Sequence, residues 1–418
     1  MTASDLAAAL TIARRRLIPL LFLLYVVAYL DRINVGFAAL QMNRALGLSA
    51  TAYGLGAGMF FISYVLFEVP SNVILARVGA RVWIARIMIT WGLVSSAMMF
   101  VRSAQAFFVL RFLLGAAEAG FFPGIIFYLT RWFPSRERAR TVAAFMTATL
   151  IAGVIGGPMS GALLALDGRG GLGGWQWLFL LEGVPAVVLG VVVLRVLTER
   201  PQEAGWLTEA QRAALVRCLD SDVGPREYDT RAALRNRRTW LLAGVYFTIP
   251  VTLYGIGFWL PQMVKLSSPG AGDFEVGVLA AIPYAAGATA MVAVGRRSDR
   301  LNERRWHVLV PALVSAAGLA LLPLGTGVVW TIATLSIAMS GLASMFGPFW
   351  ALTTASMRGV GAAAAIALVN SLGNTGGFVG PYLLGAINDA TRSFAPGFYA
   401  IAAILTLGAV AVLFVAEE

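Results

Sequence analysis

The chain has 418 residues, of which 59% are hydrophobic and only 13% are charged. This composition excludes an ordinary soluble domain, because soluble globular proteins carry about 25% charged residues. The single cysteine, Cys218, excludes a disulfide framework, and the single histidine, His307, excludes a multi-histidine metal site. The only lysine, Lys265, is followed by leucine, so the Gly-Lys-Ser/Thr motif of an ATP-binding P-loop is absent.

Apolar runs of about 20 residues recur from end to end, each long enough to cross a bilayer as a helix. The first run has no small-residue cleavage site after a short apolar core, so we expect a retained helix and not a signal peptide. The sequence predicts an all-α membrane protein with twelve transmembrane helices near 17–40, 52–75, 82–101, 104–130, 141–166, 175–197, 239–263, 275–295, 307–325, 328–354, 361–385 and 394–415.

The formal net charge of +11 comes from arginines that gather in alternate connections between these helices. That distribution follows the positive-inside rule and argues against a nucleic-acid-binding surface. It predicts a multi-pass protein of a bacterial-type inner (plasma) membrane with both termini in the cytoplasm. The arginine-rich connections are 14–16, 77–86, 131–140, 195–238 and 296–305.

The chain divides into two six-helix halves, 1–197 and 239–418, joined by a polar linker, 198–238. In the linker, Thr208 and Gln211 have the spacing of a capping box that begins a short helix. Asn72 and Gly295 each begin a similar loop segment, and Pro158 and Pro381 each follow glycines; both pairs are 223 residues apart. This shared offset predicts two halves in the same orientation, related by an axis along the membrane normal.

The predicted helix 17–40 contains an acid, a base and an amide: Asp31, Arg32 and Asn34, shortly after Tyr29. A charge at the centre of the bilayer costs about 2.5–3.5 kcal/mol even on the insertion scales that give the smallest values. Such residues face a bundle interior or a water-filled pathway, so the sequence predicts a functional site here.

Several motifs together resemble the major facilitator superfamily and, within it, the anion:cation symporter family of tartrate- and phthalate-type permeases. The loop Gly295-x-x-x-Asp299-Arg300 is similar to the cytoplasmic loop motif of the superfamily, whereas the first-half copy has Asn72 and Ala76 at its usual glycine and aspartate positions. The segments that resemble the symporter family are 29–34, 68–72, 111–120, 132–134 and 175–183. The resemblance covers the whole chain and implies alternating access of two halves around a midplane site.

The resemblance connects a set of loop-motif residues with conformational change: Arg77, Gly79, Arg81, Gly295, Asp299 and Arg300.

The resemblance also implies that Asp31 and Glu118 carry protons. Arg111 lies seven residues before Glu118, so both side chains are predicted on one face of the helix 104–130. The alternatives are that Arg111 extends to the membrane surface and that Glu118 is a structural hydrogen-bonding acid.

Arg32 is the predicted cation for a substrate anion, with Tyr29, Asn34 and Tyr64 as further first-half contacts. The second half lacks matching charges, since the 223-residue offset places Tyr254 opposite Asp31 and Gly341 opposite Glu118. Its candidate substrate contacts are Tyr254, Trp350, Asn370 and Asn374. The two asparagines are one helical turn apart and could equally make packing hydrogen bonds.

Glu68 and Glu182 lie near the ends of their helices and are ranked below Glu118. Relatives that carry sugar acids can have a glutamine in the fifth helix, where this chain has Met146 to Thr149. Glycines recur in the segments 141–166 and 361–385, where they permit close helix approach.

The sequence thus predicts a secondary transporter that imports a small tartrate-, phthalate- or sugar-acid-like carboxylate together with protons. No cofactor or metal is expected, the predicted partners are the anion, protons and the lipid bilayer, and the monomer is the expected functional unit. A uniporter or exporter of the same fold, or a membrane sensor, are the alternatives. An enzyme is not expected, because one histidine and one cysteine do not supply a catalytic constellation.

Overall fold

The computed structural model describes residues 3–222, 234–356 and 362–415, and the regular structure in these ranges is helical. The α-helices are α1 (Ala3–Leu46), α2 (Ala50–Val78), α3 (Ala80–Ala97), α4 (Ala104–Glu118), α5 (Phe121–Thr130), α6 (Ser135–Leu164), α7 (Gly174–Val196), α8 (Glu209–Ser221), α10 (Arg237–Ser267), α11 (Asp273–Leu301), α12 (Trp306–Leu321), α13 (Val328–Ser356), α14 (Ala362–Asn374), α15 (Gly376–Thr391) and α16 (Ala395–Val412). Short 3₁₀ turns occupy Met98–Phe100, Arg169–Gly171, Pro201–Glu203 and Leu322–Leu324.

Eleven helical stretches in the described ranges are long and apolar enough to cross a bilayer. The eleventh predicted segment, 361–385, is not among them, because it is divided at Thr375 into α14 and α15, each of which is shorter than a membrane span. The predicted segment 104–130 is likewise interrupted, because α4 ends at Glu118 and α5 begins at Phe121. The all-α, twelve-helix prediction is confirmed, but two of the predicted helices are broken ones.

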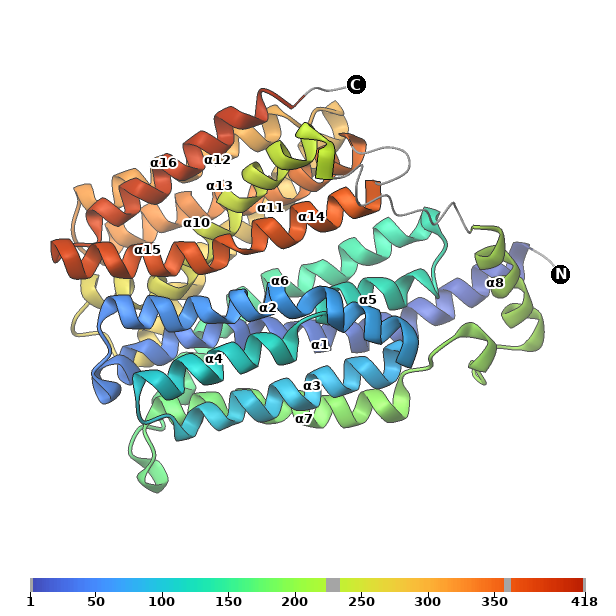
Figure 1. The fold of residues 1–418 in the computed structure, drawn as a ribbon, viewed down its shortest axis with the longest axis horizontal. Helices are drawn as coiled ribbons and strands as arrows, with labels where there is room; N and C mark the ends of the chain where they lie inside the picture. Colours follow the sequence, from blue (N-terminus) through green and yellow to red (C-terminus); the bar gives the residue numbers. More distant parts are fainter. Residues whose placement is uncertain (1–2, 223–233, 357–361, 416–418) are drawn as a thin grey trace.

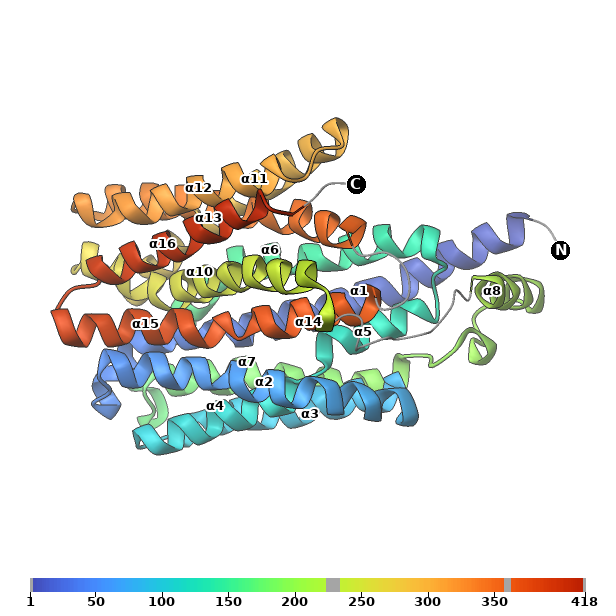
Figure 2. The same ribbon diagram turned by 45° about the horizontal axis from the view of Figure 1, so that its top comes forward.

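The two halves lie side by side with their helices along the long axis of the molecule. Figures 1 and 2 both place α2, α3 and α4 on one side and α12, α13 and α16 on the other, with the two chain termini at one end. Across the boundary between the halves, α2 packs on α15 and α6 packs on α11. We call the end with the chain termini the terminal end, and the opposite end, around Gly47, the closed end.

Glycine permits close contacts between the halves. A Cβ atom built on Gly54 of α2 would lie 2.3 Å from the carbonyl oxygen of Pro381, and one on Gly157 of α6 would lie 2.2 Å from that of Gly277. Carbon–carbon contacts are optimal only at about 3.5–4.0 Å. The approach of the helices at these points therefore depends on the missing side chain, as the glycine pattern predicted.

Polar contacts also join the halves at the closed end. The carboxylate of Asp389, near the end of α15, accepts hydrogen bonds from the backbone N–H groups of Ala50 (3.2 Å) and Thr51 (2.8 Å) at the start of α2. The amide of Gln41 in α1 donates to Asp273 at the start of α11 (2.7 Å). An acid at a helix N-terminus satisfies otherwise unpaired N–H groups and interacts favourably with the helix dipole.

The first part of the linker is bound to the first half. Glu199 accepts hydrogen bonds from the N–H groups of Ala80 and Arg81 (2.9 and 2.7 Å) and pairs with Arg131 at 2.6 Å. Trp206 stacks on Trp132 with ring centroids 5.3 Å apart.

The helix α8 that follows in the linker packs on α1. The predicted capping box is present: Thr208 and Gln211 exchange backbone and side-chain hydrogen bonds at the start of α8.

Candidate functional site

Asp31 lies in the middle of α1 and is 1% exposed. Its carboxylate accepts hydrogen bonds from Asn34 Nδ2 (2.9 Å), from the indole N–H of Trp91 and from the hydroxyl of Ser95. These three donors stabilise a buried carboxylate without a direct cation. Asn34, predicted as a substrate contact, is therefore a partner of Asp31 in this structure.

Arg32 faces the boundary between the halves. One guanidinium nitrogen forms an ion pair with Glu118 of α4, and the other donates to the hydroxyl of Tyr254 in α10 at 3.3 Å. Arg32 retains 14% side-chain exposure, whereas Glu118 retains 1%. Its Nε atom is buried with no hydrogen-bond partner in the described part of the chain. Arg32 thus connects an acid of the first half to a hydroxyl of the second.

Asp31 and Arg32 are neighbours in the sequence but form no ion pair with each other in this structure. Consecutive helical residues point about 100° apart, so the side chains of Asp31 and Arg32 do not face each other. Arg32 turns toward α4 and Asp31 turns toward α3. The acid that is paired with Arg32 is Glu118.

Arg111 is fully buried, so it does not extend to the membrane surface. One of its terminal nitrogens donates to the carbonyl oxygen of Ala57 at 3.0 Å, and its guanidinium carbon lies 5.2 Å from the ring centre of Phe60. Its Nε and Nη1 atoms have no hydrogen-bond partner among the described residues. Arg111 and Glu118, predicted on one helix face, contact different groups.

The end of α4 positions Glu118. The helix stops there because Gly120 adopts a left-handed conformation (φ 85°), which glycine reaches without strain. The hydroxyl of Ser71 donates to the carbonyl oxygen of Ala119 at 2.6 Å. A Cβ atom on Gly120 would lie 2.4 Å from that hydroxyl. The break thus holds Glu118 at a helix end deep in the bundle.

Aromatic rings surround the Arg32 guanidinium. Its central carbon lies 5.3 Å from the ring centre of Phe60 and 5.5 Å from that of Tyr64, within the range of cation–π attraction. From the second half, Tyr254 packs 4.3 Å from Phe61, centre to centre. These rings exclude water from one side of the charge.

Two further predicted substrate contacts are aromatic residues of α1 and α13. Tyr29 lies three residues before Arg32 on α1 and is half-buried. Trp350 on α13 is half-buried too, and it packs edge-on against Tyr246, with ring centres 4.9 Å apart.

Glu68, which was ranked below Glu118 because it lies near a helix end, is buried. It is 4% exposed, and its two carboxylate oxygens accept hydrogen bonds from Asn370 (3.3 Å) and Ser371 (3.1 Å) of α14. The contact joins the halves on the terminal-end side of Arg32. Asn370 is engaged here, and Asn374, also predicted to contact substrate, ends α14 one turn later.

Glu182 is also 4% exposed and accepts a hydrogen bond from Ser160 at 3.0 Å, so its position near a helix end did not bring it to the surface. No group of three or more His, Cys, Asp or Glu residues suited to a metal ion occurs in the described ranges.

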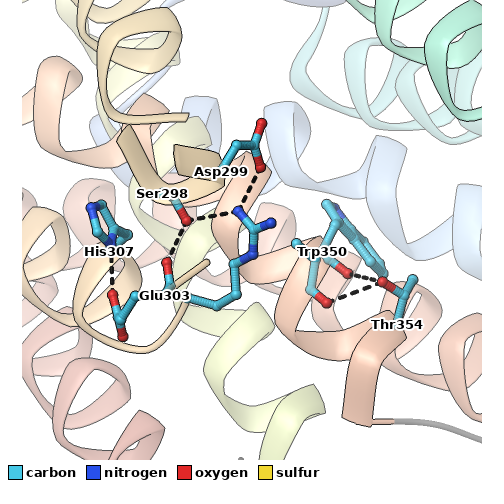
Figure 3. A network of polar contacts seen from close by, with 8 residues as sticks. Ser298, Asp299, Glu303, His307, Trp350 and Thr354 are labelled. Carbon is cyan, nitrogen blue, oxygen red and sulfur yellow. Dashed lines mark hydrogen bonds and ion pairs between the residues drawn. The ribbon is translucent and has the colours of Figure 1, made fainter. Parts of the chain in front are cut away.

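The loop motif of the second half lies at the end of α11 (Figure 3). Asp299 pairs with Arg304 at 2.6 Å, and Arg304 also donates to Ser298. Glu303 contacts His307 at 2.5 Å. Partial burial acts to raise the pKa of Glu303, but hydrogen bonds from Trp306 and His307 outweigh it and lower that pKa below its ordinary value. Asp299 thus pairs within its own half.

The remaining loop-motif residues are near helix ends. Gly79 joins α2 to α3 with a φ of 103°, a value that favours glycine. Arg77 is in the last turn of α2, Arg81 is in the first turn of α3, and Gly295 and Arg300 are in the last turns of α11.

A family model described as Major Facilitator Superfamily matches residues 21–381. The chain belongs to the major facilitator superfamily. A protein of Agrobacterium vitis named "Putative tartrate transporter" is 49% identical over 406 residues, which are 96% of this chain and 90% of that protein. The "Inner membrane transport protein RhmT" of Escherichia coli is 38% identical and covers 94% of this chain and 92% of its own.

Solved structures of the superfamily share the fold. A bacterial homologue of the human lysosomal transporter Spinster aligns with a TM-score of 0.78 at 17% identity, over 96% of each chain. The inward-open xylose transporter XylE of E. coli aligns with a TM-score of 0.76 at 13% identity, over 97% of each chain. This chain is therefore a multi-pass transporter of the major facilitator superfamily whose relatives include transporters of organic anions.

Proposed function

We propose that the protein is a proton-coupled symporter that imports a small organic carboxylate, with Arg32 as the anion-binding residue and Glu118 as its proton-sensitive partner. The observation that supports this proposal most strongly is the buried ion pair between these two residues, at a point where Tyr254 of the second half also contacts Arg32. An ion pair at this depth can be separated only if another anion replaces the carboxylate or a proton neutralises it.

The exchange of partners links the two ligands. When Glu118 takes up a proton, its hold on Arg32 weakens, and the guanidinium can accept the carboxylate of the substrate in a bidentate geometry. One entering proton and one entering carboxylate group together leave the net charge of the site unchanged, so a dicarboxylate is balanced by two protons. Each ligand therefore lowers the free-energy cost of binding the other, which is the condition for thermodynamic coupling.

Asp31 supplies a second titratable carboxylate in the same region. Its three hydrogen-bond donors come from α1 and α3, so it does not compete directly for Arg32. We assign it a proton that is exchanged during the transport cycle, separate from the proton that controls the ion pair. Arg111, which is buried and has two nitrogens without a hydrogen-bond partner among the described residues, adds positive potential to this part of the first half.

Tartrate is the first substrate to test, because the name of the 49% identical relative refers to it. The proposal includes a functional monomer in an inner (plasma) membrane with both termini cytoplasmic, for which the arginine-rich connections are the support. No cofactor is required, since protons are the coupling ion.

The test uses purified protein in liposomes with an imposed pH gradient, inside alkaline, and radiolabelled tartrate. Wild-type protein should accumulate tartrate, and Glu118→Gln should lose accumulation while retaining exchange of tartrate across the membrane. Arg32→Lys keeps the charge but loses the planar guanidinium group, which can donate two parallel hydrogen bonds to a carboxylate. The loss of one charge-assisted hydrogen bond costs about 1.5–3 kcal/mol. Binding should therefore weaken roughly 10- to 150-fold.

Arg44→Lys is the matched control, because Arg44 is exposed in the last turn of α1. Equal tartrate affinity in Arg32→Lys and the wild type would refute the role of Arg32. Undiminished accumulation by Glu118→Gln would refute coupling through Glu118. Transport of tartrate by the wild type that ignores the pH gradient would indicate a uniporter of the same fold.

A further inference from the structure

The end of α11 carries a basic groove that is separate from the Arg32 site. Arg296, Arg297 and Arg300 line it together with Ala293 and Leu301, and its volume is about 490 Å³. Residues three and four apart share a face of a helix, so these side chains project to one side of α11. Ala293 contributes no more than a methyl group and leaves space beneath the guanidinium groups.

The three arginines have no hydrogen-bond or ion-pair partner among the described residues. All three are exposed, and the acid next to them in sequence, Asp299, is paired with Arg304. Nothing described in the groove neutralises its three positive charges. Guanidinium groups bind phosphate oxygens with two parallel hydrogen bonds, so the groove has the chemistry of a phosphate site.

The groove lies at the end of a helix that is long and apolar enough to cross a bilayer, beside exposed apolar side chains. Leu301, which lines it, is 59% exposed, and Trp306, at the start of the next helix, is 57% exposed. Exposed tryptophans are typical of the membrane–water interface. Val292 and Val310, on α11 and α12, continue the exposed apolar surface. A phospholipid whose phosphate is bound by the arginines would have its acyl chains beside this surface.

We propose that the groove binds the head group of an anionic phospholipid. All five lining residues belong to α11, so the groove is open along the surface of this helix and a glycerophosphate head group can reach its arginines. Basic pockets at the ends of transmembrane helices are known to select anionic lipids by this chemistry. The exposed apolar surface beside the arginines favours the lipid over soluble phosphate.

The test measures lipid binding to the purified full chain in a neutral detergent. Dioleoylphosphatidylglycerol, dioleoylphosphatidylcholine and inorganic phosphate are titrated separately, with retained lipid counted by native mass spectrometry and melting temperature recorded in parallel. Phosphatidylglycerol should remain bound and raise the melting temperature, and the other two should not. In the triple variant Arg296→Gln, Arg297→Gln, Arg300→Gln, the apparent affinity for phosphatidylglycerol should fall at least tenfold.

The control variant Arg15→Gln, Arg195→Gln, Arg235→Gln removes the same charge from exposed positions outside the groove and should keep wild-type binding. Ala293→Trp keeps every arginine but fills the groove, so it should also weaken the binding of phosphatidylglycerol. This variant tests the site if the triple variant fails to fold. Equal loss in the control and groove variants would overturn the site. An equal effect of inorganic phosphate would overturn its assignment to a lipid.

Discussion

Replacing Gly157 by alanine should open the closed end of the transporter. The new Cβ atom would lie 2.2 Å from the carbonyl oxygen of Gly277 in the other half, so α6 and α11 must separate by roughly 1.3 Å to restore ordinary contact. Overpacking of this kind costs about 1–3 kcal/mol. The cost applies only while the halves are in contact here, so the closed-end state should lose population by roughly 5- to 150-fold relative to the state in which this end is open.

Gly341→Ala is the matched control. Its Cβ atom would meet the carbonyl oxygen of Pro311 at 2.4 Å, and both residues belong to the second half. The same clash inside one half should reduce thermal stability without favouring either conformation.

Distances between spin labels at Ala45→Cys and Ala390→Cys, exposed positions of the two halves, report on the closed end after Cys218→Ser removes the native thiol. A longer distance in Gly157→Ala and an unchanged one in Gly341→Ala are expected. An unchanged distance in Gly157→Ala, or an equal change in both variants, would refute the reasoning.

Four further predictions follow from individual carboxylates. Asp31→Asn should abolish pH-driven accumulation of tartrate in liposomes but retain substrate exchange, and full accumulation would contradict a proton role. Glu68→Gln keeps one acceptor for the hydrogen bonds of α14 but removes the charge; spin-label distances across the terminal end should lengthen, and unchanged distances would show that the charge does not hold this contact. Asp299→Asn should shift the resting population toward opening at the terminal end without abolishing binding, and an unchanged ratio of labelling at the two ends would make Asp299 only a surface charge. Finally, partial burial acts to raise the pKa of Asp389, but hydrogen bonds from the start of α2 outweigh it and hold the pKa below its ordinary value of 3.8. The stabilisation of the closed end by Asp389 is therefore complete at pH values above 3.8 and is lost as the pH falls through the lowered pKa. Spin labels at the closed end should report no opening caused by protonation of Asp389 between about pH 8 and pH 5.

Most of the fold could be predicted because the bilayer restricts the choices. A spanning chain must satisfy its backbone hydrogen bonds within each segment, so apolar length alone identified the helices. The breaks at Gly120 and Thr375 could not be predicted in the same way. A glycine inside an apolar run also occurs in unbroken helices, and the break at Gly120 depends on Ser71, which is brought there by another helix.

The charged residues of the candidate site could be selected from the sequence, but their contacts could not be predicted. Asp31, Arg32 and Glu118 stand out because charges are rare at this depth. Which acid contacts Arg32 depends on how α1 and α4 are rotated about their axes, and no pattern within one helix contains that information. The burial of Glu68 could not be predicted for a related reason: its position near a helix end indicated access to water, but α14 covers it.

The attachment of the linker to the first half has a practical consequence. Glu199 binds the start of α3, Trp206 stacks on Trp132, and α8 packs on α1. We therefore expect this part of the linker to move together with the first half. Any rotation of the second half relative to the first should therefore leave the position of α8 on the first half unchanged. An antibody fragment raised against α8 would serve as a rigid marker of the first half in cryo-electron microscopy.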